Sequence, residues 1–145
     1  MSDPTHVQYW INGEPATAWP CDDRGLLYGD GVFESMAVLD GHVRSLERHL
    51  ARLTRGCRAL GFEPPAEQDL QSDLEAMASA LGVSRRQCLR LTVTRGRGAR
   101  GYAPPEDPTP ARLWALAAWP EVQSEWQAQG LAVTWLDVTL AHQPM

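Results

Sequence analysis

Alternating hydrophobic and polar residues predict several short β-strands along the chain. The stretches with this pattern are residues 6–11, 32–39, 88–94, 113–119 and 131–140. The first two run into Asn12-Gly13 and Asp40-Gly41, which are residue pairs typical of two-residue β-hairpin turns. We therefore expect two β-hairpins and an antiparallel sheet.

Two other stretches carry apolar residues at steps of three and four, which is the spacing of one helix face. The first begins after Ser45, an expected N-cap, and stops at Gly61; the second follows Pro64 and Pro65 and stops at Gly82. We expect both helices to pack on one face of the sheet. The fold class that these elements predict is α+β, an antiparallel β-sheet with two packed helices.

The remaining segments include a proline-rich loop over residues 103–110 and a short helix over residues 121–129. A stretch rich in aspartate and glycine before residue 32 is expected to be irregular. The chain stops directly after a predicted strand, without the polar tail that usually ends a domain. We therefore expect residues 1–145 to form the N-terminal domain of a two-domain protein.

Composition narrows the function classes. A net charge of −5 disfavours general nucleic-acid binding, and no apolar stretch approaches the length of a membrane span. The three cysteines, Cys21, Cys57 and Cys88, form no Cys-x-x-Cys pair, which favours a reducing compartment and predicts no zinc site. We expect a cytoplasmic protein without a metal, a membrane or a nucleic-acid partner. All 13 basic residues are arginine, so this chain offers no lysine for chemistry that needs a side-chain amine.

Residues 23–34 contain three glycines and four charged residues in twelve positions. One interpretation is structural, with glycines that supply positive φ angles and acids that cap local turns. The same string is similar to the Asp-Arg-Gly, Gly-Asp-Gly and Phe-Glu signature of fold-type IV pyridoxal-phosphate enzymes. That family comprises D-amino-acid aminotransferases, branched-chain aminotransferases and aminodeoxychorismate lyases.

The resemblance continues at residues 49–53, which are similar to the family's His-x-x-Arg-Leu motif. In that family the arginine of the motif binds the cofactor phosphate, which implies this role for Arg52. A guanidinium suits a phosphate because it is always charged and donates two parallel hydrogen bonds. His49 is expected to pack or hydrogen-bond beneath the site. The alternative, a solvated position on the helix, is expected for the four neighbouring arginines, Arg44, Arg48, Arg55 and Arg58.

Residues 94–102 form a basic, glycine-punctuated loop after a predicted strand. By itself this loop resembles a short arginine-glycine RNA-binding tract, and that alternative stays open. In the lyases a similar Arg-Gly-x-Gly-x-Arg-Gly-Tyr string occupies this place, and related aminotransferases use the matching loop to reach a substrate carboxylate. The resemblance implies that Arg100 and Tyr102 bind substrate, with Arg97 and Tyr28 as further candidates.

Within the family, two departures favour the lyases. D-amino-acid aminotransferases usually carry tyrosine where this chain has Phe33, and branched-chain aminotransferases usually lack the spacing of Gly29, Asp30 and Gly31. The resemblance thus implies a homodimeric lyase that uses pyridoxal 5'-phosphate to convert 4-amino-4-deoxychorismate to 4-aminobenzoate and pyruvate in folate biosynthesis. It also implies that the loop of residues 94–102 reaches into the partner's active site.

One lysine anchors the cofactor and moves the proton in this family. Because the chain contains no lysine, we expect it to hold no catalytic residue and to be inactive alone. Two alternatives stay open: a D-amino-acid or branched-chain aminotransferase of the same fold, and a non-catalytic binding or dimerisation module.

Overall fold

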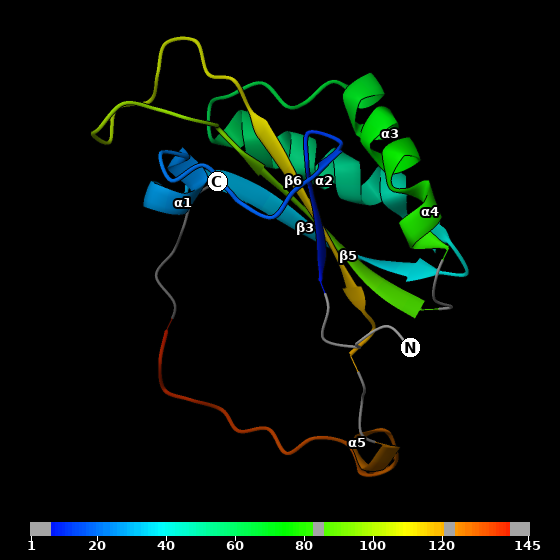
Figure 1. Cartoon of the computed structure of the whole chain (residues 1–145). Coiled ribbons are helices and arrows are strands. Elements are labelled where there is room, and N and C mark those ends of the chain that lie inside the picture. Colours follow the sequence, from blue (N-terminus) through cyan, green and yellow to red (C-terminus); the bar gives the residue numbers. More distant parts are fainter. Residues whose placement is uncertain (1–6, 83–85, 121–123, 140–145) are drawn as a thin grey trace.

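The computed structural model describes residues 7–82, 86–120 and 124–139, and its centre is one six-stranded sheet (Figure 1). The strand order is β2-β1-β6-β5-β3-β4. The strands are β1 (Gln8–Ile11), β2 (Glu14–Pro15), β3 (Gly31–Leu39), β4 (His42–Val43), β5 (Arg86–Thr94) and β6 (Ala111–Ala118). All of these neighbours pair antiparallel, which confirms the predicted fold class.

Both predicted hairpins are confirmed. The first turn has φ angles of 50° at Asn12 and 85° at Gly13, and the second has 50° at Asp40 and 79° at Gly41. Two successive positive φ angles match the right-handed twist of the flanking strands, and Asn, Asp and Gly adopt them at low cost. The strand predicted from residue 6 is described from Gln8, and His6 lies outside the described residues.

The predicted helices are α2 (Leu46–Ala59) and α3 (Glu67–Ala76), followed by α4 (Ala78–Leu81). Ser45 occupies the N-cap position of α2, but its φ of 52° is left-handed and its hydroxyl makes no capping hydrogen bond. The second predicted helix is interrupted at Met77, which separates α3 from α4. The predicted apolar spacing holds across this break, since Leu81 of α4 is buried in the same core.

Both α2 and α3 cover the same face of the sheet, as predicted. Glu34, Leu91 and Trp114 are cross-strand partners, and such partners point to one face. A residue of α2, Arg52, bonds Glu34, and a residue of α3, Asp73, bonds Trp114. Figure 1 shows the helices together on that side. The core between the layers includes Met36, Val38, Leu53, Met77, Leu89, Val93 and Leu116.

Two regions differ from the predictions. The stretch expected to be irregular contains a short helix, α1 (Arg24–Tyr28). The strand predicted over residues 131–140 is wrong for residues 131–139, which form no strand and lie exposed, with Trp135 fully so. A strand needs a hydrogen-bonding neighbour, and the described residues offer none here.

Residue 140 lies outside the described residues. The helix predicted over residues 121–129 is described as α5 (Ser124–Gln129), and residues 121–123 lie outside the described residues. Within the described ranges, no helix is long and apolar enough to cross a membrane.

Candidate functional site

The short helix α1 forms because its two ends are capped. Oδ1 of Asp23 accepts hydrogen bonds from the backbone N–H groups of Gly25 and Leu26, at 2.8 and 3.3 Å. Oδ2 of this fully buried carboxylate accepts from the Thr94 hydroxyl at 2.8 Å, which joins the helix to the end of β5. Gly29 ends the helix with a left-handed φ of 66°, a conformation that glycine adopts without strain. These residues therefore fit the structural interpretation of the motif.

Two further glycines are required by close contacts. A Cβ added to Gly25 would lie 2.2 Å from Cγ2 of Thr94, and one added to Gly31 would lie 2.7 Å from the carbonyl oxygen of Val93. Both distances are too short for any side chain. The motif therefore packs α1 and the start of β3 directly against β5.

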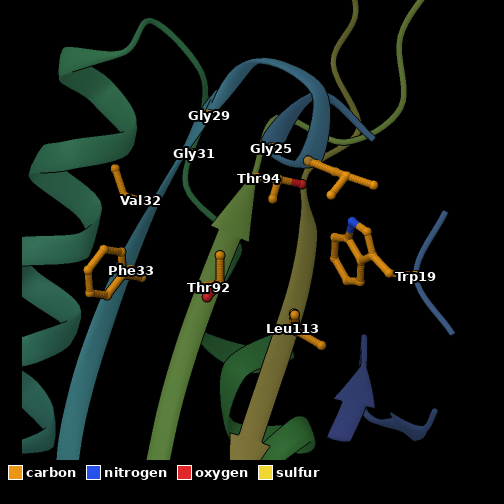
Figure 2. A pocket seen from close by; sticks show the side chains of 10 residues that line it. Trp19, Gly25, Gly29, Gly31, Val32, Phe33, Thr92, Thr94 and Leu113 are labelled. Carbon is orange, nitrogen blue, oxygen red and sulfur yellow. The ribbon is translucent and has the colours of Figure 1, made fainter. Parts of the chain in front are cut away.

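Beside this contact, a cavity of about 520 Å³ opens on the sheet face opposite α2 and α3 (Figure 2). Phe33, Thr92 and Leu113 line it and are paired in register, one row away from the row that faces the helices. Trp19 and Leu26 complete a mainly apolar wall. Small-molecule sites typically occupy roughly 300–1,000 Å³ and have apolar linings, so this cavity is large enough for a small ring compound.

A positive charge lies beside the cavity. The guanidinium carbon of Arg90 lies 3.8 Å from the centroid of the Phe33 ring, which is a cation–π contact. Arg90 is exposed on β5, and its cross-strand partners are Ser35 and Ala115. The open sheet face therefore presents an arginine next to the aromatic residue that lines the cavity.

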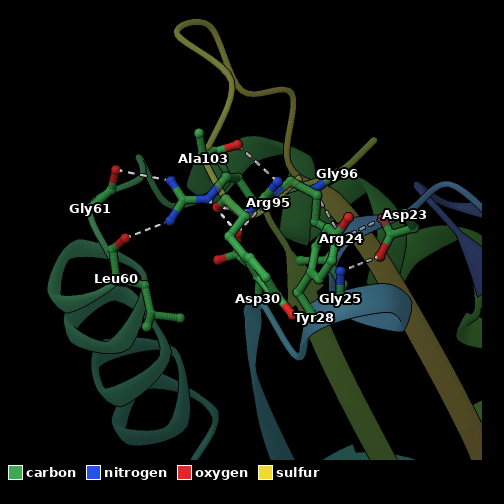
Figure 3. A network of polar contacts seen from close by, with 12 residues as sticks. Asp23, Arg24, Gly25, Tyr28, Asp30, Leu60, Gly61, Arg95, Gly96 and Ala103 are labelled. Carbon is green, nitrogen blue, oxygen red and sulfur yellow. Dashed lines mark hydrogen bonds and ion pairs between the residues drawn. The ribbon is translucent and has the colours of Figure 1, made fainter. Parts of the chain in front are cut away.

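Asp30 holds two arginines together at the end of the sheet (Figure 3). Its Oδ2 accepts hydrogen bonds from Nε of Arg24 and from Nε of Arg95, both at 2.8 Å. Burial alone would raise the pKa of Asp30, but the hydrogen bonds and charges of Arg95 and Arg24 outweigh it and lower the pKa. The carboxylate therefore stays ionised between two cations.

The two arginines reach different segments of the chain. Arg95 donates to the carbonyl oxygens of Leu60 and Gly61, at 2.6 and 3.2 Å, just after the end of α2. Arg24 donates to the carbonyl oxygens of residues 101–103, at 2.9 to 3.2 Å. Asp30 thereby links the end of α2 to the loop between β5 and β6.

That loop carries three of the sequence-predicted substrate residues. Tyr102 lies against the fourth, Tyr28, with ring centroids 5.3 Å apart, and the Tyr28 hydroxyl accepts a hydrogen bond at 3.1 Å from the backbone N–H of Gly101. Arg97 forms an exposed ion pair with Asp22 at 2.8 Å. Arg100 is exposed and makes no hydrogen bond or ion pair with the described residues. The structure brings Tyr28 and Tyr102 together and leaves Arg97 paired elsewhere.

Arg52 lies in a separate group on the α2 side of β3. Its Nε donates to Oε1 of Glu34 at 2.6 Å, its Nη2 donates to Oε2, and Nδ1 of His49 lies 2.7 Å from Oε2. The hydrogen bonds from Arg52 lower the pKa of Glu34, against the opposing effect of burial and with a smaller contribution from His49. The Glu34 side chain is 3% exposed, whereas that of Arg52 is 64% exposed. A buried carboxylate thus holds one edge of the guanidinium and leaves the other edge at the surface.

Sequence reasoning missed several residues of these groups. Trp19 and Arg90 carried no signal, and Arg24, Asp30 and Glu34 were recognised only as parts of a motif. Arg52 is not among the residues that line the cavity. The predicted exposure of the four neighbouring arginines is confirmed for Arg44, which precedes α2, and for Arg48, Arg55 and Arg58 on α2.

No cluster of metal-ligating side chains occurs among the residues described. Cys21, Cys57 and Cys88 are free thiols. Burial raises the pKa of Cys57 to about 11, so this thiol stays protonated and unreactive at neutral pH.

Three comparisons relate this geometry to known proteins. A family model described as amino-transferase class IV matches residues 31–144. The chain is 27% identical, over 94% of its length, to an aminodeoxychorismate lyase from Vibrio harveyi, and 38% identical, over 57%, to a putative branched-chain-amino-acid aminotransferase from Methanocaldococcus jannaschii. The crystal structure of 4-amino-4-deoxychorismate lyase from Pseudomonas aeruginosa superposes with a TM-score of 0.71 and 45% identity over 83% of this chain.

The chain spans only part of these proteins. It covers 49% of the Vibrio protein, 28% of the Methanocaldococcus protein and 43% of the Pseudomonas chain. The matched portion of the Pseudomonas structure includes an antiparallel sheet like the one described above.

Proposed function

The chain belongs to the amino-transferase class IV family, and from this membership we propose that the protein is a pyridoxal-phosphate-dependent 4-amino-4-deoxychorismate lyase. Its products would be 4-aminobenzoate and pyruvate. The similarity to the Pseudomonas lyase, 45% identity, is the observation that carries the proposal. When bound, pyridoxal phosphate supplies an electron-withdrawing ring for the elimination of the enolpyruvyl group. The lysine that this chemistry needs would lie in a part of the full-length protein that corresponds to the portion of the relatives not matched by this chain.

The role proposed for Arg52 is to hold the cofactor phosphate. Glu34 accepts from Nε and from one N–H of Nη2, so Nη1 keeps two N–H groups and Nη2 keeps one for a phosphate. The same contact raises the pKa of Arg52 and orients its fork, mainly through the hydrogen bond to Glu34. An oriented and exposed guanidinium edge fits a phosphate dianion.

Arg52→Ala in the full-length protein is expected to weaken pyridoxal-phosphate binding about tenfold or more, because a charge-assisted hydrogen bond to phosphate is lost. Arg48→Ala and Arg55→Ala, which remove exposed arginines of the same helix, should change it less than about twofold. The measurement is a titration of the apoprotein followed by cofactor absorbance. Equal losses in all three variants would remove Arg52 from the proposed site.

The open sheet face and the loop above it are the proposed substrate side. The apolar cavity beside Phe33 would exclude water from a substrate ring, and Arg100 and Tyr102 would bind the substrate's polar groups. Arg100 is a suitable carboxylate ligand because no acid among the described residues pairs with it.

Arg100→Met is therefore expected to raise KM or to lower kcat/KM by about tenfold, the effect of losing one charged hydrogen bond, with an unchanged cofactor spectrum. Steady-state kinetics and the absorbance of the bound cofactor check both parts. Loss of the cofactor in this variant would contradict the assignment of Arg100 to the substrate.

The proposal extends to a cytoplasmic homodimer whose loop of residues 94–102 reaches the partner's site. An aminotransferase is the second candidate, favoured by the 38% identity to the Methanocaldococcus protein. One experiment separates the two. Full-length protein incubated with 4-amino-4-deoxychorismate should release 4-aminobenzoate without an added keto acid, whereas an aminotransferase would need an amino-acid and keto-acid pair.

A further inference from the structure

We propose that Arg24, oriented by Asp30, is a positioning residue that holds the substrate loop in its binding conformation. The substrate loop is residues 96–103, which carry Arg100 and Tyr102. This inference rests on the proposed function, because it assigns Arg24 to the residues that support substrate binding. Arg24 itself would touch neither substrate nor cofactor.

The Arg24 guanidinium donates hydrogen bonds to the backbone of the loop. Nη1 donates to the carbonyl oxygens of Gly101 and Ala103, at 3.2 and 3.1 Å, and Nη2 donates to that of Tyr102 at 2.9 Å. The remaining donor, Nε, is bonded to Asp30 at 2.8 Å. The residue is 3% exposed, so these charge-assisted hydrogen bonds are made away from solvent, where they are strongest. One guanidinium thus fixes three consecutive peptide units.

Two side chains that the loop presents are exposed. Tyr102 is 86% exposed and Arg100 is exposed as well, although the backbone of residues 101–103 is bonded to a buried cation. A fixed backbone with exposed side chains suits a binding loop, since it lowers the entropy lost when ligand binds.

The loop needs such a tether because its glycines allow many backbone conformations. Gly96 and Gly101 have φ angles of 89° and 122°, and a Cβ on Gly98 would lie 2.9 Å from Cδ of Arg24. Glycines allow the loop to pass close to the Arg24 side chain, and they also enlarge the range of conformations that it can adopt when unbonded. The hydrogen bonds from Arg24 offset that freedom.

Asp30 connects this tether to the rest of the proposed site. It also binds Arg95, which donates to Leu60 and Gly61 after the end of α2, the helix that carries Arg52. The carboxylate therefore fixes the substrate loop relative to the helix proposed to bind phosphate. Removing its charge should loosen the loop without removing any side chain of the loop itself.

The test uses the full-length protein with Arg24→Met and Asp30→Asn, and Arg112→Met as the matched control. Arg112 is also a largely buried arginine held by a carboxylate, Asp73, but its guanidinium contacts Asp69 and Asp73 on α3 and not the loop. Amide hydrogen exchange of residues 98–104 and steady-state kinetics are measured for each variant.

Arg24→Met and Asp30→Asn are each expected to speed exchange of residues 98–104 and to raise KM, both about tenfold, with kcat and the cofactor spectrum little changed. Arg112→Met should alter neither KM nor loop exchange. Loop exchange that rises no more than in the control, or a fall in kcat at constant KM, would overturn the inference. Should Arg24→Met not fold, Asp30→Asn gives the same two readouts.

Failure of the proposed function is distinguishable from failure of this inference. Wild-type protein that releases no 4-aminobenzoate refutes the lyase, and the exchange data then decide alone whether Arg24 holds the loop.

Discussion

Asp73→Ala is expected to lower the free energy of unfolding by about 3–5 kcal/mol, the usual cost of removing one partner from a buried ion pair. The Asp73 carboxylate is 2% exposed on α3. It accepts from Nε of Arg112 at 2.6 Å, from Nη2 of Arg112 at 3.0 Å and from the indole N–H of Trp114 at 2.8 Å. Alanine would leave a largely buried cation and a buried donor without this acceptor, and would release α3 from β6.

Urea unfolding followed by circular dichroism measures the loss, and Asp69→Ala is its matched control. Asp69 lies one turn earlier on α3 and approaches the same guanidinium at 3.7 Å, but its side chain is 54% exposed. Its removal should cost less than about 1 kcal/mol, as for other exposed pairs. Asp73→Asn, which keeps an acceptor for Trp114 but loses the charge, should fall between the two. Similar losses for Asp69→Ala and Asp73→Ala would show that burial does not govern this contact.

The parts of the fold that follow from local rules could be predicted from the sequence. The turns at Asn12-Gly13 and Asp40-Gly41 need positive φ angles, and Asn-Gly and Asp-Gly pairs are typical of such turns. The alternation over residues 88–94 places Leu89, Leu91 and Val93 on one side of the strand, and all three are buried in β5. By contrast, α1 has five residues, too few for an apolar period to appear, and it depends on a cap contact between Asp23 and Thr94 that spans 71 positions.

The segment of residues 131–139 shows the limit of pattern reasoning. Its alternation of Leu131, Val133 and Trp135 is that of a strand, yet all three side chains are exposed. Periodicity describes which face a strand would bury, but it does not supply the neighbouring strand that completes the hydrogen bonds. No such neighbour occurs among the described residues.

The candidate site was predictable only in part for the same reason. The family motifs implicate Arg52, but the carboxylate that holds it, Glu34, is recognised only once β3 and α2 are packed together. The tether from Arg24 to Tyr102 joins residues 78 positions apart, and no short motif contains both. Trp19 lines the cavity from a stretch that has no distinctive pattern. Motifs thus indicate the residues proposed for binding, and tertiary contacts indicate the residues that hold them in place.

Mixed with pyridoxal phosphate, the 145-residue chain is expected to form no covalent adduct through any side chain and to release no 4-aminobenzoate. The reason is chemical: the cofactor aldehyde reacts with a primary amine, and a chain without lysine offers only its N-terminal α-amino group. Borohydride reduction followed by peptide mass spectrometry makes any adduct permanent and locates it. Reversible binding through Arg52 does not require lysine, so weak, reduction-insensitive binding is expected to remain.

The control for this experiment is the same chain with Arg52→Ala, which should lose the reversible binding while its adduct pattern stays unchanged. A stoichiometric adduct on an internal residue, or product release by the 145 residues alone, would contradict the proposal that the catalytic lysine lies outside this chain. A longer version that contains the remaining length of its relatives should gain both a single lysine adduct and activity, because it would unite the arginine proposed for phosphate with the missing amine. Lack of an adduct in that longer version would remove pyridoxal phosphate from the proposed function.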